Sequence, residues 1–198
     1  MSYLGNAPVF PTESVLPGNL QVTGNATISG SSATVNGNEV RTVGTSGAIL
    51  QVVHFSTSTN TATTSSTFTD TALTASITPT SSSNKIMVHV VANAGWSKSS
   101  SQSWAGGLRI LRDSTVIETP SDDNGPISFY TATFGQTASA GISRSQQSFF
   151  AYDSPATTSS VTYKAQIASR DGSAQVDLNT AGTPNATSHI ILMEVVAW

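Results

Sequence analysis

Residues 85–92 read KIMVHVVA, and this stretch decides the fold class. Every second position, namely Ile86, Val88 and Val90, is apolar and β-branched, a period typical of a strand that buries one face in a core. The stretch at 189–198, HIILMEVVAW, is apolar enough to form another central strand. Both stretches predict a β-sheet protein with a substantial core.

Strand-like runs recur along the chain from residue 46 onward, and no segment has a convincing helical period. The predicted strands are residues 49–55, 68–77, 85–92, 108–111, 116–117, 128–134, 147–152, 161–168, 174–178 and 189–198. Residues 112–115 are expected to turn one hairpin. Asp171-Gly172 is expected to turn a second, because Asp-Gly suits the tight turns that match strand twist. The series predicts an all-β fold in which residues 46–198 form an antiparallel β-sandwich, jelly-roll-like in architecture.

The first 18 residues differ in texture from this domain. They contain Pro8, Pro11 and Pro17, and proline favours extended backbone at its own position and at the one before it. We therefore expect residues 1–18 to be an extended arm that docks on a partner surface; a loose terminal tail is the alternative. The apolar residues expected to anchor the arm are Tyr3, Leu4, Val9, Phe10, Val15 and Leu16.

Residues 19–45 repeat a small triplet in which one apolar residue is followed by a polar residue and a glycine, as in Val22-Thr23-Gly24 and Ile28-Ser29-Gly30. Strands this short cannot close a core within one chain, whereas three copies wound around one axis share one. We therefore predict a trimeric β stem, with a flexible linker as the alternative. Its predicted core residues are Leu20, Val22, Ile28, Val35 and Val40.

The composition narrows the classes of partner. Only 10% of the 198 residues are charged and the net charge is −3, with no basic run, so neither nucleic acid nor an anionic membrane is an expected partner. The chain has no cysteine, which excludes disulfides and thiolate metal sites. The N-terminus lacks a basic region followed by an apolar run, so export by a classical secretory route is not expected.

No catalytic constellation stands out, and we predict no enzymatic activity, metal or cofactor. His54, His89 and His189 each lie in an apolar run without a second ligand at metal-binding spacing, which indicates structural or interface histidines. Trp96 and Trp104 flank a polar stretch and are candidates for glycan stacking or for a subunit interface. The interpretation that we prefer is that both rings anchor that stretch to the sandwich or to a neighbouring subunit.

Several segments resemble virion appendage proteins of tailed bacteriophages, especially cyanobacterial and marine phages. These segments are MSYLGNAP at the N-terminus, NLQVTGNATISG in the stem, and ITPTSSSNKIMV, LRILRDSTVI, YDSPATTSSVTYKAQI and HIILMEV in the C-terminal domain. The stem segment is similar to the short triple-stranded stalks of these proteins. The C-terminal segments look like the β-sandwich knob at the end of their chains.

The resemblance implies a non-enzymatic homotrimer that is part of a virion and is assembled in the cytoplasm of the host bacterium. Residues 1–18 would bind the capsid or another virion protein, residues 19–45 would clamp the trimer, and residues 46–198 would form the outward knob. The short chain favours a capsid decoration, cement or head-fibre protein over the alternative, a tail fibre that binds host surface glycans. A bacterial surface adhesin is a distant alternative.

Overall fold

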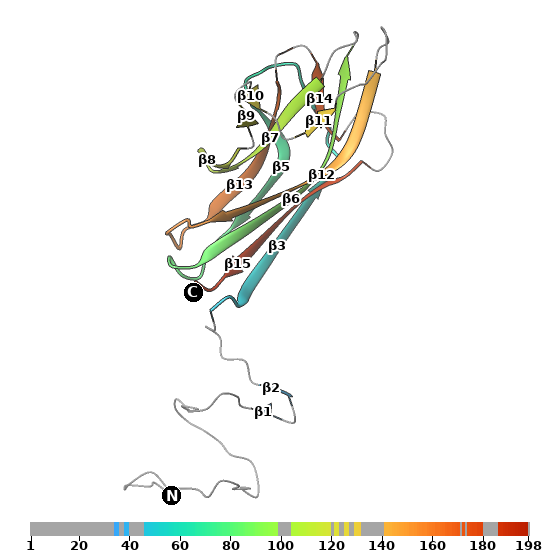
Figure 1. Cartoon of the computed structure of the whole chain (residues 1–198). Helices are drawn as coiled ribbons and strands as arrows, with labels where there is room; N and C mark the ends of the chain where they lie inside the picture. The colour runs from blue at the N-terminus through green and yellow to red at the C-terminus, as the bar shows by residue number, and fades with distance from the viewer. Residues whose placement is uncertain are drawn as a thin grey trace, which may run out of the picture. The chain divides into compact units, whose positions relative to one another are not determined.

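The computed structural model describes residues 34–35, 38–39, 46–98, 104–119, 121–122, 125–126, 129–131, 141–170, 172, 174–179 and 186–197. The chain divides into two units, Met1–Arg41 and Thr42–Trp198. In the first unit, β1 (Thr34–Val35) and β2 (Asn38–Glu39) form a two-stranded antiparallel ladder. The second unit is a domain of two antiparallel β-sheets (Figure 1).

The first sheet contains six strands and the second contains five. The strands of the first sheet are β3 (Ile49–Thr57), β4 (Thr61–Thr63), β6 (Lys85–Lys98), β12 (Gly141–Asp153), β14 (Gln175–Leu178) and β15 (Ser188–Val195). The strands of the second sheet are β5 (Thr69–Ile77), β7 (Trp104–Arg112), β8 (Thr115–Glu118), β11 (Phe129–Thr131) and β13 (Val161–Ser169). The short strands β9 (Ser121–Asp122) and β10 (Gly125–Pro126) pair with each other.

In the first sheet, the long strand β6 has β12 along one edge and two successive neighbours along the other. Its first half pairs with β15, which in turn pairs with β3, so that the local order is β3-β15-β6-β12. Its second half pairs with β14, which in turn pairs with β4. The second sheet has the order β5-β13-β7, with β8 and β11 paired to different parts of the far edge of β7.

These pairings are nested along the chain. The hairpin β7·β8 lies innermost, and the pairs β6·β12, β5·β13, β4·β14 and β3·β15 follow in order outward. The chain is therefore one long antiparallel ribbon, folded back between β7 and β8, whose successive pairs go to one sheet or the other. A ribbon wound in this way into two sheets is a jelly roll, and the prediction of a jelly-roll-like β-sandwich is confirmed.

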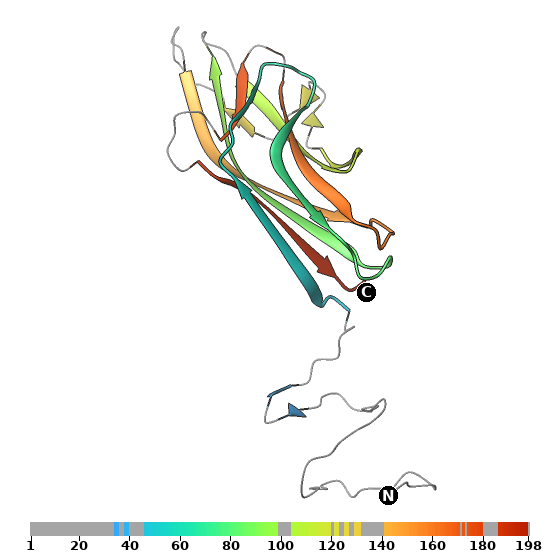
Figure 2. The ribbon, with the colours of Figure 1, turned by 180° about the vertical axis from the view of Figure 1, so that it is seen from behind.

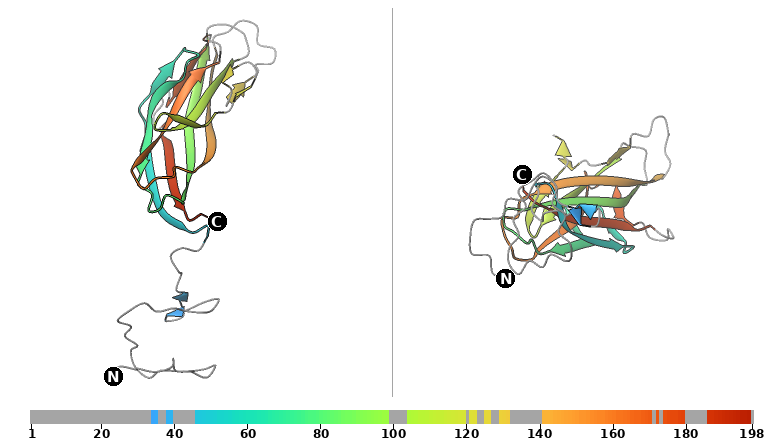
Figure 3. Two further views of the ribbon diagram at one scale, coloured as in Figure 1. Left: turned by 90° about the vertical axis from the view of Figure 1, so that its left-hand side faces the viewer. Right: turned by 90° about the horizontal axis from the view of Figure 1, so that it is seen from below.

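The core lies between the two sheets. Ile86, Val88 and Val90 are fully buried there, as the alternation in KIMVHVVA predicts. The second sheet contributes Leu73, Tyr163 and Ile167 to the same core, among others. None of the described segments is a helix, so none of them is a helix that could cross a membrane. Neither sheet is covered by a described helix (Figures 1, 2 and 3).

A buried polar cluster fills the place where β6 changes its neighbour from β15 to β14. The amide nitrogen of Asn179 donates to the carbonyl oxygens of Thr57 (2.8 Å) and Thr59 (3.2 Å), and its amide oxygen accepts from the Ser188 hydroxyl at 2.7 Å. The Asn93 side chain donates to the carbonyl of Thr187. Asn179 has a positive φ of 54°, a conformation that asparagine tolerates better than most residues. These contacts satisfy backbone groups that the interrupted ladder leaves open.

The predicted hairpin at residues 112–115 is confirmed as β7·β8, in which Arg112 pairs with Thr115 and Asp113 has a φ of 52°. The predicted hairpin at Asp171-Gly172 is wrong. β13 lies in the second sheet and β14 in the first, so the chain passes between the sheets at this point. Both edges of β13 are already occupied, by β5 and by β7, and leave no place for β14.

Candidate functional site

The first sheet carries apolar residues on both of its sides. On β6, the residues between the buried positions are Met87, His89 and Val91, which point outward and are half-buried. Because only one side of the sheet faces the other sheet, this second apolar side is turned away from the core. It is the first candidate for a functional surface.

Cross-strand pairing extends this outward surface over four strands and three rows. Read across β3, β15, β6 and β12, the rows are Val52-Met193-Met87-Tyr152, His54-Ile191-His89-Phe150 and Ser56-His189-Val91-Ser148. We call these residues the apolar face. Residues that oppose one another in such rows lie close enough for their side chains to interact across the strands.

Large apolar side chains of this face are open to solvent. Val52, Phe150 and Tyr152 are 58%, 50% and 47% exposed. From the spacing of strands and of alternate residues, the three rows cover about 400 Å² of sheet. A patch of about 300–600 Å² is the largest that a typical monomeric protein exposes, and such patches are often functional. The apolar face is therefore comparable in extent to the largest apolar patch of a typical monomer.

All three histidines of the chain lie on the apolar face. His54 on β3 and His189 on β15 are diagonal neighbours, and His54 Nε2 lies 3.1 Å from His189 Nδ1. The ring centroids are 5.4 Å apart with planes 16° apart. Because the two nitrogens are closer together than the centroids, the rings meet edge to edge and are joined by one N–H···N hydrogen bond. In this hydrogen bond one ring nitrogen must donate and the other must accept.

The third histidine packs against the edge strand β12. His89 Nε2 lies 2.8 Å from the Ser148 hydroxyl, and its ring centroid lies 4.9 Å from that of Phe150. These contacts hold the His89 ring against the Phe150 ring. The row therefore presents a continuous surface of imidazole and hydrocarbon.

Strand β3 forms one margin of the apolar face and is an edge strand of its sheet. It pairs with β15 on one side, and no described strand pairs with its other edge. Its sequence, ILQVVHFST, contains no charged residue and no proline, the residues that commonly protect natural edge strands. Ile49 and Phe55 add exposed apolar surface at this margin, at 55% and 40% exposure. The free edge of β3 therefore lacks the residues that would hinder contact with another protein chain, as does the apolar face.

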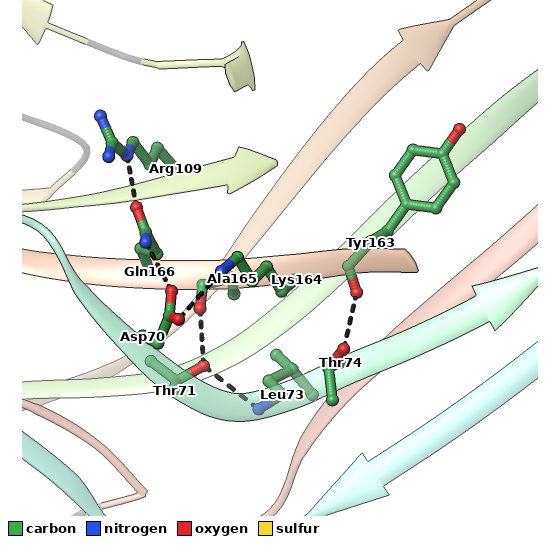
Figure 4. A network of polar contacts seen from close by, with 9 residues as sticks. All are labelled: Asp70, Thr71, Leu73, Thr74, Arg109, Tyr163, Lys164, Ala165 and Gln166. Carbon is green, nitrogen blue, oxygen red and sulfur yellow. Dashed lines mark hydrogen bonds and ion pairs between the residues drawn. The ribbon is translucent and has the colours of Figure 1, made fainter. Parts of the chain in front are cut away.

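The outer surface of the second sheet differs from the apolar face, because it carries a group of polar side chains that are paired with one another (Figure 4). Arg109 Nε donates to the Gln166 amide oxygen at 2.7 Å, and the Gln166 amide nitrogen donates to the Asp70 carboxylate. Lys164 donates to the same carboxylate at 2.9 Å. The hydrogen bond from Lys164, then that from Gln166, lowers the pKa of Asp70 below its ordinary value. This surface has its own partners within the domain.

A buried carboxylate ties the first sheet to the loop between β5 and β6. Glu194 on β15 is fully buried and accepts four hydrogen bonds: from Gln51 Nε2 (2.6 Å), Asn84 Nδ2 (2.6 Å), and the Thr80 amide (2.7 Å) and hydroxyl (2.8 Å). Burial alone would raise the pKa of Glu194, but the hydrogen bonds from Asn84, Gln51 and Thr80 outweigh it and lower that pKa. The carboxylate is therefore a structural anion, held ionised by neutral donors.

A second buried carboxylate ties the two sheets at the opposite margin. Asp153 on β12 lies 2.7 Å from Arg112 Nη1 on β7 and accepts from the Tyr163 hydroxyl of β13, also at 2.7 Å. Burial, then the hydrogen bond to Asp153, raises the pKa of Tyr163 far above its ordinary value. The tyrosine thus remains a neutral donor to the carboxylate. This triad is also a structural device that joins the sheets.

The residues predicted as functional are placed as follows. All six arm residues, and Leu20, Val22, Ile28 and Val40 of the stem, lie outside the described residues. Val35 lies in β1, where it pairs with Asn38. Trp96 on β6 is buried at 2% exposure within the core, so its ring is not presented to a glycan in this chain. Trp104 begins β7, but its side chain lies outside the described set.

Sequence reasoning missed the apolar face, which depends on pairings between distant strands. His54 and His189 are 135 residues apart in the chain.

In the part of the chain that the structure describes, no group of three or more histidine, cysteine or acidic side chains is arranged to hold a metal ion. What the described arrangement offers chemically is a largely hydrophobic contact surface whose three rows contain no acid, lysine or arginine.

Comparison of the sequence with protein-family models and with curated proteins found no match.

Proposed function

We propose that this chain is a non-enzymatic structural protein of a bacteriophage particle. It acts as a homotrimer that is attached to the particle by residues 1–18, is joined by the stem at residues 19–45, and presents the jelly-roll domain outward. Attachment to the capsid, as a decoration or head-fibre protein, is preferred to attachment to the tail. The observation that carries the proposal is the exposed apolar face.

The apolar face supports a role in assembly because its chemistry suits contact with another protein surface. Val52, Phe150 and Tyr152 offer hydrocarbon and aromatic area, and no side chain of the three rows is an acid, a lysine or an arginine. Burial of apolar area is the main favourable term in protein association. A domain with such a surface contributes to assembly by contacting other protein surfaces.

The resemblance to virion appendage proteins and the jelly-roll fold add support of a weaker sort. The segments that carry the resemblance include LRILRDSTVI and HIILMEV, which form the β7·β8 hairpin and most of β15. Jelly rolls are frequent among viral structural proteins, but the same architecture occurs in lectins and cupins. The fold by itself is thus an analogy, and the apolar face carries the argument.

The proposal is tested on purified virions. Gel densitometry against a protein standard counts the copies of the chain in each particle. A capsid decoration predicts on the order of hundreds of copies, because a closed symmetric shell repeats its binding site many times, whereas a tail fibre predicts a few tens at most. Absence of the chain from purified particles would refute a virion role.

A second experiment tests the arm. The full-length chain and a variant that lacks residues 1–18 are each added to particles that do not carry the protein, and bound chain is measured after sedimentation. We expect the full chain to bind and the truncated chain to stay in the supernatant as a soluble trimer. Equal binding of the two would show that the arm is not the anchor.

A further inference from the structure

We propose that the apolar face is the contact between jelly-roll domains of neighbouring copies of this chain. The inference rests on the proposed homotrimer and adds to it, because the stem was the expected trimer contact and the domains were expected only to project from it. The occupant of the face is a second copy, which covers Val52 and Phe150 and shields the free edge of β3.

Charge is the first reason to favour a second copy. A surface that meets its own copies must not repel them, and the three rows contain no carboxylate, lysine or arginine. Lys85 and Arg144 lie beyond the rows, at opposite ends of the sheet, and Lys85 is engaged with the Ser154 hydroxyl at 2.6 Å. A nucleic acid or an acidic surface would need a basic counterpart, which the rows do not have.

The area of the face is the second reason. Its roughly 400 Å² of sheet is about half of the roughly 800 Å² that each partner contributes to a standard stable interface. Two free domains joined by this face alone would associate weakly. A contact of this strength suits subunits that are already held together elsewhere, since joining raises the effective concentration to the millimolar range.

The course of the chain is the third reason. The N-terminal segment, which contains the stem, leads into β3 at Ile49, and β3 forms one margin of the apolar face. Chains that are joined through residues 19–45 would therefore deliver β3 of each domain close to the point of joining. The margin with the exposed Ile49 and Val52 is the part of the domain that a neighbouring copy reaches first.

Thiol protection tests the contact directly, because the chain has no cysteine of its own. Single cysteines are placed in the full-length chain by Val52→Cys on the apolar face and by Ser76→Cys on the outer side of β5. Both positions are exposed in the single domain and lie on edge strands. Oligomeric state is measured by light scattering, and the reaction rate with a small maleimide is measured on the same sample.

We expect an oligomer in which V52C reacts at least about tenfold more slowly than S76C, because a contact formed nine-tenths of the time leaves a tenth of the sites open. Adding Phe150→Lys, which places a charge in the contact, is expected to raise the V52C rate to that of S76C. Thermal unfolding of each variant verifies that it is folded, and the V52C measurement alone suffices if the lysine variant does not fold.

Other outcomes overturn distinct parts of the argument. An oligomer in which V52C and S76C react alike would refute the contact between domains and leave the proposed trimer intact. A chain that remains monomeric at all concentrations would refute the homotrimer and this inference with it. Protection of V52C on virions, but not in the free oligomer, would assign the face to another particle protein and overturn the choice of a second copy.

Discussion

Replacement of Glu194 by glutamine tests how the end of the sandwich is held. The substitution keeps the size and shape of the side chain and removes its charge. One amide oxygen can still accept from some of the four donors that Gln51, Thr80 and Asn84 supply. The new amide nitrogen, however, adds a fifth hydrogen-bond donor to the four already present. It has no acceptor in this arrangement unless the Gln51 side-chain amide flips and presents its oxygen.

The magnitude follows from the four contacts. A hydrogen bond to a charged group contributes about 1.5–3 kcal/mol to stability, and a neutral one about 0.5–1.5, so loss of the charge costs about 1 kcal/mol for each bond. Relief of the cost of burying the charge offsets part of that sum. We expect Glu194→Gln to lower the free energy of unfolding by about 2 kcal/mol, and Glu194→Ala, which removes every acceptor, by about 4 kcal/mol.

Thermal and urea unfolding measure the effect, at one protein concentration so that any oligomerisation is constant. A loss of 2 kcal/mol corresponds to a fall in Tm of about 4–8 °C for a domain of this size. The control is Asp70→Asn on the outer side of the second sheet, where the carboxylate is 58% exposed and its ion pair contributes less than about 1 kcal/mol. Equal stability of wild type and the glutamine variant would refute the argument that the four hydrogen bonds depend on the charge.

The same carboxylate predicts a dependence on pH. Since the pKa of Glu194 is lowered in the folded chain from an ordinary value of 4.5, ionised Glu194 stabilises the fold above pH 4.5. This contribution is lost as the pH falls through the lowered pKa. The difference in stability between wild type and Glu194→Gln is therefore expected to be constant at neutral pH and to shrink under acid. A difference that grew under acid would contradict the direction of the shift.

Substitutions at three further positions probe other parts of the domain, each by urea unfolding. Tyr163→Phe removes one donor to the Asp153 carboxylate and is expected to cost about 1.5–3 kcal/mol; no change would mean that Arg112 alone satisfies Asp153. Asn179→Ala removes three side-chain hydrogen bonds at a positive φ and should cost about 3 kcal/mol, with Asn179→Gly less harmful because glycine accepts that φ; the reverse order would refute the role of the backbone. Gly47→Ala meets no atom within 4 Å, so its cost of about 1 kcal/mol should come from its φ of 80° alone.

The strands were predictable because each has a recognisable pattern of apolar residues within its own short segment of sequence. Alternation in KIMVHVVA identified β6 and its buried side, and the runs at 49–55 and 161–168 identified β3 and β13. The pairing of the strands was harder to predict, because a turn motif depends on neighbouring residues, whereas the two strands of a pair can be far apart in the sequence. Asp171-Gly172 lies between β13 and β14, yet β13 already has β5 and β7 on its edges. A turn between alternating runs therefore predicts a change of direction more securely than it predicts a hairpin.

The apolar face had a signal that the alternation alone did not use. KIMVHVVA is apolar at the odd positions Met87 and Val91 as well as at the even ones, and HIILMEVV likewise adds Ile191 and Met193. Runs that are apolar on both sides indicate burial on both sides. In a two-layer sandwich only one side faces the core, so such a run predicts an external partner. The His54–His189 contact had no such signal, because it depends on the register of β15 against β3.

The predicted arm, most of the predicted stem and the side chain of Trp104 lie outside the described residues, so those predictions stand as they were made. Trp96 lies in the core, which agrees with the preferred interpretation of an anchoring ring rather than with glycan stacking. The polar residues that follow it indicated an exposed loop, but Trp96 lies within β6 at an inward position and fills the core. Position along a strand decides burial more strongly than the polarity of the neighbouring loop.

The nested ribbon has a consequence for the timing of synthesis. A ribosome makes β3 early, but its partner β15 begins at Ser188, so β3 waits until nearly all of the domain has been made. The apolar face needs β3, β15, β6 and β12 together and is therefore completed late, while the β7·β8 hairpin can form first. During translation, neighbouring nascent chains present no finished face to one another. Under the proposed contact between copies, late completion of the face would delay their association until the whole domain has been made.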